Sequence, residues 1–300
     1  FIPTSGGLAT GMKSVHDHGE SLWIGWLGVS SEEITEPEFD DLTKQLVSQK
    51  YKPISLSQNE IDEFYLGFSN QAIWPLFHYF KQFFKFENEQ WENYVSVNQK
   101  YADSILEEID DGDKIWIHDY QLLLVPKMIK SVKKNITIGF FLHIPFPSFE
   151  IFRLFPKREE LLNGILGADL IGFHTYDYQR HFLSSVRRIL HLNVSFNLIE
   201  QFDRKIIVNT FPMGIDYEKF ERTSIEHKKI DKKKYSQLRT QLEKHKLNNQ
   251  GKIILSIDRL DYTKGIVNRI KSFELFLDKY PQYQNKLRLL MVCVPSRSKV

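Results

Sequence analysis

The stretch KIWIHDYQLLLVPKMIKSVKKNITIGFFLHIPFP, residues 114–147, decides the fold. It holds a short strand-like segment at 114–118, after the turn at 111–113, and an apolar run at 136–142, joined by a segment of helical character at 120–132. The apolar run is continuous, as expected of a strand that is buried on both faces of a parallel sheet. A strand, a helix and a second strand in this order predict an α/β fold with parallel strands.

The same alternation continues toward the carboxyl end. Helical segments are predicted at 148–167, with a break near Pro156, and at 177–190, and further strands at 169–173 and 206–209. A polar, lysine-rich stretch follows, with an exposed helix at 232–246, and then a strand at 252–257, a helix at 265–280 and a strand at 287–294. We therefore predict two doubly wound, Rossmann-like domains, the second incomplete because two strands cannot close a sheet. The predicted divisions are a first domain at 1–212, a linker with the exposed helix at 213–250, and the start of a second domain at 251–300.

Composition and charge argue against several classes of partner. The chain has 300 residues and a net charge of only +2, which gives no case for nucleic acid or a membrane surface. No apolar run approaches the roughly 18 residues of a membrane span. The single cysteine, Cys293, lies in an apolar run and is interpreted as a buried thiol in a strand, which fits a reducing, cytoplasmic setting. The 23 phenylalanines are interpreted first as core residues.

The triplet Asp111-Gly112-Asp113 matches an Asp-x-Asp metal motif. We interpret it as a turn, because Asp-Gly is a strong turn signal and the triplet precedes its strand instead of following it. No cluster of histidine, cysteine and carboxylate residues has convincing metal-ligand spacing, so we predict no metal.

Polar residues follow the predicted strands where ligands bind in open α/β sheets, beyond the carboxyl ends. Asp119 follows the first strand and is expected to bind sugar hydroxyls, to cap the next helix, or both. His143 follows the second strand and is either a donor to a sugar hydroxyl or a satisfied core histidine. Arg297 follows the last strand.

Arg259 and Lys264 flank the loop before the helix that is predicted to begin near Gly265. Two cations and the free N–H groups of a helix start would make a cradle for a diphosphate. Salt bridges of these cations with Asp258 and Asp261 are an equally open alternative.

Six motifs occur in order, and together they resemble the trehalose-6-phosphate synthases. They are SGGLA at 5–9, WIGW at 23–26, NQAIWPLFHY at 70–79, WIHDY at 116–120, GFFLHIPFP at 139–147 and DRLDYTKG at 258–265. Taken alone, Gly7 would be an ordinary turn glycine or a point of backbone approach to a phosphate, and Tyr65 and Trp74 would be core aromatics.

The resemblance implies a GT-B fold, with two domains facing across a cleft that holds the active site. The first domain would bind the acceptor and the second the nucleotide-sugar. Glucose would pass from UDP-glucose, a co-substrate, to glucose 6-phosphate with retention of configuration, and without a cofactor or metal. The implied site residues are Gly7, His143, Arg259 and Lys264 for the donor, Trp26, Tyr65, Trp74, Asp119 and Arg297 for the acceptor, and Asp119, His143, Arg259 and Lys264 for catalysis.

The same resemblance leaves one alternative function, a catalytically silent synthase-like regulatory domain. The partners it allows are a homo-oligomer and a fused or associated trehalose-phosphate phosphatase. The family's first strand, with its Asn-Arg pair, and its later donor-binding segment are expected before Phe1 and after Val300, so we expect a chain truncated at both ends.

Overall fold

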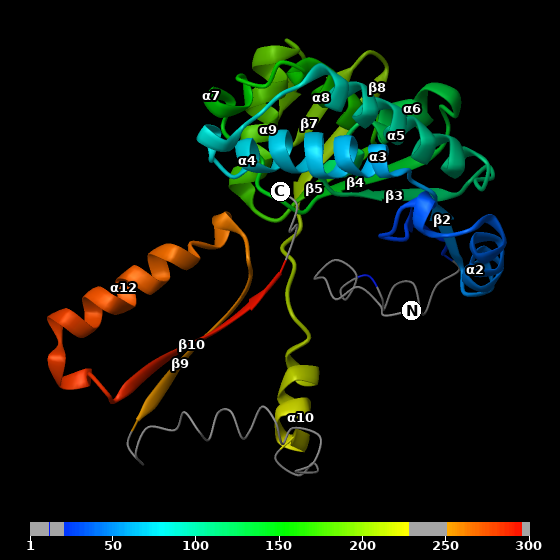
Figure 1. Cartoon of the computed structure of the whole chain (residues 1–300). Coiled ribbons are helices and arrows are strands. Elements are labelled where there is room, and N and C mark those ends of the chain that lie inside the picture. Colours follow the sequence, from blue (N-terminus) through cyan, green and yellow to red (C-terminus); the bar gives the residue numbers. More distant parts are fainter. Residues whose placement is uncertain (1–11, 13–20, 228–250, 296–300) are drawn as a thin grey trace. The chain divides into compact units, whose positions relative to one another are not determined.

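The structure, a computed structural model, describes residue 12, residues 21–227 and residues 251–295 (Figure 1). The chain divides between Gly214 and Ile215 into two compact units. The predicted end of the first domain was residue 212, and the binding role given to each domain stays a prediction. Among the described residues, no helix is both long enough and apolar enough to cross a membrane.

The first unit is built on a sheet of six strands in the order β3-β4-β5-β8-β7-β6. The parallel strands β3 (Lys114–His118), β4 (Thr137–Leu142), β5 (Leu170–Phe173) and β8 (Arg204–Thr210) confirm the four that the sequence predicts. The antiparallel strands β7 (Leu198–Gln201) and β6 (Asn193–Ser195) were not predicted. They are short, and most of their residues are polar or partly exposed, so they lack the apolar run that marks the central strands.

The helices after these strands agree with the prediction, with one correction. Helices α7 (Phe149–Phe152) and α8 (Arg158–Ile165) are separated around Pro156, as predicted, and α9 (Tyr176–Ile189) lies against β5 and β8 (Figure 1). The single helix predicted at 120–132 is wrong. A short 3-10 turn, η4 (Tyr120–Leu122), is followed by α6 (Val125–Val132), whose first turn contains Pro126. Proline lacks an N–H and is tolerated in the first turn of an α-helix but not in its interior, so the α-helix begins next to this proline.

The amino-terminal part of this unit forms a second, two-stranded parallel sheet. Strands β1 (Trp23–Trp26) and β2 (Tyr51–Ile54) are connected through a 3-10 turn, η1 (Ser31–Glu33), and helix α2 (Glu36–Ser48). Next come α3 (Gln58–Glu60), the π-helix η2 (Ile61–Ile73), α4 (Trp74–Phe77), η3 (Lys81–Phe83) and the long helix α5 (Asn88–Leu106). A π-helix of 13 residues is unusual, since π-helices mostly occur as single turns and often at functional sites.

Phenylalanines make up most of the largest fully buried side chains, in agreement with the prediction that they are core residues. The rings of Phe77, Phe146 and Phe152 are fully buried, and their centroids lie 4.9–6.0 Å apart. Such offset and edge-to-face contacts add to the free energy of burying the rings.

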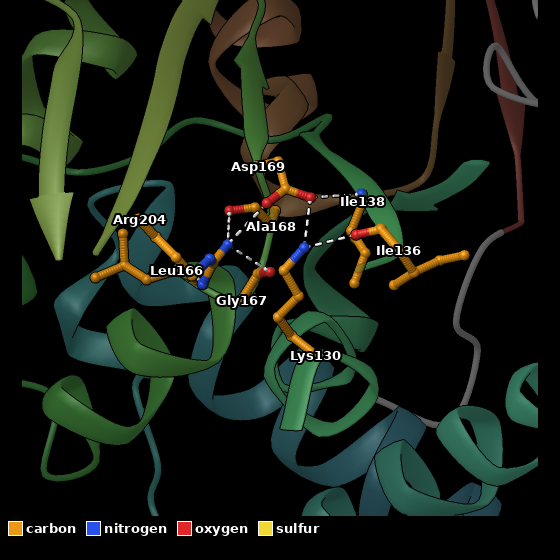
Figure 2. Close-up of polar contacts among 8 residues, drawn as sticks. All are labelled: Lys130, Ile136, Ile138, Leu166, Gly167, Ala168, Asp169 and Arg204. Atoms are coloured by element: carbon orange, nitrogen blue, oxygen red, sulfur yellow. Dashed lines mark hydrogen bonds and ion pairs between the residues drawn. The ribbon is translucent and has the colours of Figure 1, made fainter. Parts of the chain in front are cut away.

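A polar network lies at the amino-terminal ends of the parallel strands, opposite the end where the site is predicted. The carboxylate of Asp169 accepts hydrogen bonds from Lys130 Nζ at 2.9 Å, from the Ile138 N–H at 2.8 Å and from Arg204 at 3.0 Å. The Arg204 guanidinium also donates to the carbonyls of Leu166, Gly167 and Ala168, which follow helix α8. Figure 2 shows Asp169 between the two cations. The network therefore ties the amino-terminal ends of β4, β5 and β8 to helices α6 and α8.

The second unit contains α10 (Tyr217–His227), two parallel strands and a helix between them. Strand β9 (Lys252–Arg259) is followed by η5 (Tyr262–Lys264), α12 (Ile266–Lys279), η6 (Pro281–Tyr283) and β10 (Leu287–Val294). The strands and the helix confirm the prediction for 252–294, whereas the helix predicted at 232–246 lies outside the described residues. Cys293 lies in a strand as predicted, but its thiol is exposed and not buried. Its strand pairs only with β9 among the described strands, so the end of the apolar run is left uncovered.

Candidate active site

Asp119 and His143 follow adjacent strands and are joined to each other. The last residue pair of β3 and β4 is His118 with Phe141, and the Asp119 N–H extends this pairing by donating to the Phe141 carbonyl at 2.8 Å. The His143 N–H then donates to Oδ1 of Asp119 at 3.2 Å. The structure thus brings together two predicted site residues that are 24 positions apart in the chain.

The expected helix-capping role of Asp119 is not observed. Asp119 occupies the position before η4, but its side chain makes no capping hydrogen bond. Its backbone lies at φ 72° and ψ 174°, a region that is almost restricted to glycine and costs of order 1–3 kcal/mol for other residues. Strain of this kind clusters at functional sites, where the surrounding structure maintains it.

Three histidines lie at the carboxyl ends of the adjacent strands β3, β4 and β5: His118 is the last residue of β3, and His143 and His174 follow β4 and β5. Nδ1 of His118 lies 3.0 Å from Nε2 of His143, and the ring of His174 packs edge-on against His143 with centroids 5.3 Å apart. Burial lowers the pKa of His118 to about 4. Burial, and then the neighbouring His118 and His174, lower the pKa of His143 to about 3, and burial also lowers the pKa of His174. The imidazoles are therefore neutral near pH 7 and suited to bind hydroxyl groups rather than phosphates.

The predicted acceptor aromatics lie in two places. The ring of Trp26, at the end of β1, is 5.4 Å from that of Tyr65 in the π-helix. Trp74 is 5% exposed, and its ring packs 5.6 Å from Tyr120, the residue after Asp119. Asn70, which is buried, links these parts: it donates to the Tyr65 carbonyl at 2.7 Å and accepts from the Tyr120 hydroxyl at 2.9 Å.

The second unit presents its predicted cations around the start of helix α12. Arg259 ends β9, and Lys264 is half-buried just before Gly265, whose φ of 61° allows the turn into the helix. Of the two carboxylates named in the salt-bridge alternative, Asp258 pairs with Arg269 at 2.8 Å, and Asp261 accepts from the Thr263 N–H at 2.9 Å. In the described part of the chain, Lys264 forms no ion pair with a carboxylate. Such a loop can hold an anion with two side-chain charges and free backbone N–H groups.

Two predicted site residues, Gly7 and Arg297, lie outside the described residues. The Asp111–Asp113 triplet forms the predicted turn before β3, with Gly112 at φ 97°. The sequence analysis did not assign a role to His118, His174 or Asn70. The position of His118 and His174 at the carboxyl ends of strands could have identified both as candidates. Asn70 carries no such signal, because its contacts depend on the π-helical geometry.

The whole chain, residues 1–300, matches the family model described as Glycosyltransferase family 20. An alpha,alpha-trehalose-phosphate synthase [UDP-forming] of Botryotinia fuckeliana is 42% identical over 306 residues, covering 100% of this chain and 56% of the relative. The 56 kDa subunit of the Saccharomyces cerevisiae synthase is 41% identical, with coverage of 100% and 60%. A bifunctional trehalose-6-phosphate synthase/phosphatase of Thermoproteus tenax is 40% identical, with coverage of 98% and 40%. The chain thus spans little more than half the length of the first two relatives.

Solved structures share the fold. An E. coli structure bound with UDP-2-fluoro glucose has a TM-score of 0.85 at 31% identity, covering 100% of this chain and 64% of its own. A synthase of Burkholderia xenovorans in complex with glucose-6-phosphate has a TM-score of 0.85 at 27% identity, with coverage of 100% and 65%. The N-terminal domain of a Candida albicans trehalose-6-phosphate phosphatase has a TM-score of 0.79 at 33% identity, with coverage of 94% and 60%. These likenesses confirm the predicted α/β fold of the GT-B type.

Proposed function

The chain belongs to glycosyltransferase family 20, and from this premise we propose that the complete protein transfers glucose from UDP-glucose to glucose 6-phosphate, forming trehalose 6-phosphate. The observation that carries the proposal is the direct link between Asp119 and His143, at the carboxyl ends of adjacent parallel strands. Relatives at 41–42% identity are named as UDP-forming synthases, and similar structures hold a UDP-glucose analogue and glucose-6-phosphate.

The positive charges among the described site residues suit the departure of UDP in this reaction. The bond between the anomeric carbon and the diphosphate oxygen breaks, and a bond from that carbon to an acceptor hydroxyl oxygen forms. Negative charge develops on the departing UDP, which takes up the acceptor's proton in the overall balance. Fixed cations aimed at this charge lower the barrier, and we assign that role to Arg259 and Lys264.

In this proposal an uncharged imidazole binds the donor sugar and a carboxylate binds the acceptor sugar. His143 contacts the donor glucose, and the Asp119 carboxylate holds hydroxyls of the acceptor. Trp26, Tyr65, Trp74 and Arg297 form the acceptor-phosphate pocket, and Gly7 lies against the donor phosphates. Because two side-chain cations serve the diphosphate, the reaction needs no metal ion and no cofactor.

A silent regulatory domain is the second candidate function. One observation favours it, the 33% identity to a domain of a phosphatase. Retention of Asp119, His143, Arg259 and Lys264 favours the active enzyme, because a silent copy has no need of them. The bifunctional relative supports a fused or associated phosphatase as a partner. A homo-oligomer and a cytoplasmic location complete the proposal.

Nucleotide release from UDP-glucose by the complete protein tests the proposal. The reaction is run with glucose 6-phosphate, with glucose, and without an acceptor, and the product is identified by mass. Release that requires glucose 6-phosphate and yields a disaccharide phosphate supports the synthase. A folded protein that releases nothing from several nucleotide-glucose donors would move the assignment to the silent regulatory domain.

A further inference from the structure

His118 contacts the same ring to which the proposed function assigns the donor sugar. Its Nδ1 lies 3.0 Å from Nε2 of His143, within ordinary hydrogen-bond distance, and the two ring centroids are 5.2 Å apart. The rings of His118 and Trp116 are also in contact, with centroids 4.7 Å apart. His143 packs in turn against Phe141 at 4.6 Å and His174 at 5.3 Å. These neighbours fix both imidazoles in place.

The valence of imidazole makes this contact informative. A neutral imidazole has one N–H donor and one bare acceptor nitrogen. A hydrogen bond between two neutral rings therefore uses one donor and one acceptor, and it fixes the tautomers of both rings together. Because Nε2 of His143 is engaged by His118, Nδ1 is the ring nitrogen of His143 that is left for another partner.

We propose that His118 is a positioning residue, which holds the His143 ring by this hydrogen bond so that Nδ1 of His143 binds a hydroxyl group of the donor sugar. The inference rests on the proposed function, since it refines the role of His143 in that reaction. His118 acts through His143 and touches no reacting atom.

The surroundings support a neutral pair in this role. The groups that pack around His143 are the rings of His118, His174 and Phe141 and the backbone link to Asp119, whose carboxylate accepts from the His143 N–H. Burial lowers the pKa of both His118 and His143 well below 6.5. The pair therefore works by orientation and hydrogen bonding, and not by supplying positive charge.

Nitrogen-15 NMR of the histidine rings tests the hydrogen bond without any reference to activity. The complete protein is labelled at histidine, and signals are assigned with His118→Asn and His143→Asn. At pH 7 we expect only one of the two facing nitrogens, His118 Nδ1 and His143 Nε2, to carry a proton. Two protonated or two bare nitrogens at these positions would overturn the proposal, even if the protein had no transferase activity.

Amide substitutions test which nitrogen serves the sugar. The amide of asparagine can take the place of Nδ1, whereas that of glutamine reaches further, toward the place of Nε2. His118→Leu should lower kcat/KM for UDP-glucose by about tenfold to a hundredfold, because a misplaced binding group costs rate, and should leave KM for glucose 6-phosphate unchanged. His118→Asn should restore most of the loss, because its amide keeps the hydrogen bond to His143.

The second pair of variants gives the complementary result. His143→Asn should retain more kcat/KM for UDP-glucose than His143→Gln. An active wild-type protein in which His118→Leu loses nothing, or in which His143→Gln is the better variant, would overturn this inference and leave the proposed function standing. A wild-type protein without activity would defeat the proposed function, and the NMR result alone would then decide whether the histidine pair exists.

Discussion

The main-chain N–H of His143 donates to the carboxylate of Asp119 at 3.2 Å, so the first residues after two neighbouring strands hold each other in place. In this arrangement the backbone of Asp119 is strained, with φ 72° and ψ 174°. Aspartate thus occupies a position where glycine would be less strained, as is expected of a residue whose side chain has a functional task.

This strain leads to a prediction that separates stability from function. Asp119→Gly and Asp119→Ala both remove the carboxylate, and both should abolish most transfer activity if Asp119 holds the acceptor. Only glycine relieves the backbone, so Asp119→Gly should have the larger free energy of unfolding, by about 1–2 kcal/mol. Urea unfolding of the two variants measures the difference. An alanine variant as stable as the glycine variant would show that the backbone is not strained.

The network around Asp169 should contribute to stability and not to catalysis. Lys130, Asp169 and Arg204 have side chains that are 12%, 31% and 27% exposed, so removing the carboxylate leaves two partly buried cations without a partner. Asp169→Ala should lower the free energy of unfolding by about 2 kcal/mol, less than for a fully buried pair because water still reaches the site. The measurement is urea unfolding.

Asparagine is the sharper test of this network. Oδ2 of Asp169 accepts from Lys130 and Ile138, and Oδ1 accepts from Arg204. In Asp169→Asn, the amide NH2 group would face Lys130 and Ile138 or Arg204, which are themselves hydrogen-bond donors. The variant should therefore recover little of the stability that Asp169→Ala loses. Activity per folded molecule should stay near that of the wild type, because the network lies at the opposite ends of the strands from His143. An asparagine variant as stable as the wild type would contradict the role given to both oxygens.

The two neutral histidines predict a loss of stability in acid. The pKa is about 4 for His118 and about 3 for His143 in the folded protein, against 6.5 for an unperturbed histidine. Between pH 6.5 and pH 4 the unfolded chain therefore binds protons that the folded chain does not. The free energy of unfolding consequently decreases as the pH is lowered through this range. The stability present above pH 6.5 is lost as pH falls toward 4.

A double variant isolates this effect from the titration of carboxylates. His118→Asn with His143→Asn removes both ionisable rings, so its stability should fall less steeply than that of the wild type between pH 7 and pH 4. Urea unfolding at several pH values gives both curves. Parallel curves would mean that the rings accept protons in the folded protein as readily as in the unfolded chain.

The central sheet could be predicted because its strands are apolar enough to stand out. Strands β3, β4 and β5 each bury several residues, and the rule that ligands bind beyond their carboxyl ends selected Asp119 and His143. The edge strands β6 and β7 could not be found in this way, since they depend on pairing with β8 for their structure. The contact between His118 and His143 depends on the register of two strands, which no local pattern of residues specifies.

Charge at the start of helix α12 gives the last prediction. Lys264 is half-buried and has no carboxylate partner in the described part of the chain, so its removal should cost the fold little. If it stabilises the departing diphosphate, Lys264→Ala should lower kcat by about a hundredfold to a thousandfold, as the loss of one preorganised donor does elsewhere. Arg259→Ala should act in the same direction. Lys271→Ala removes an equal charge from an exposed position on α12, the helix that follows Lys264, and serves as the matched control. Steady-state turnover and thermal unfolding of the three variants are compared, and equal turnover of Lys264→Ala and Lys271→Ala would show that the lysine contributes only general positive charge.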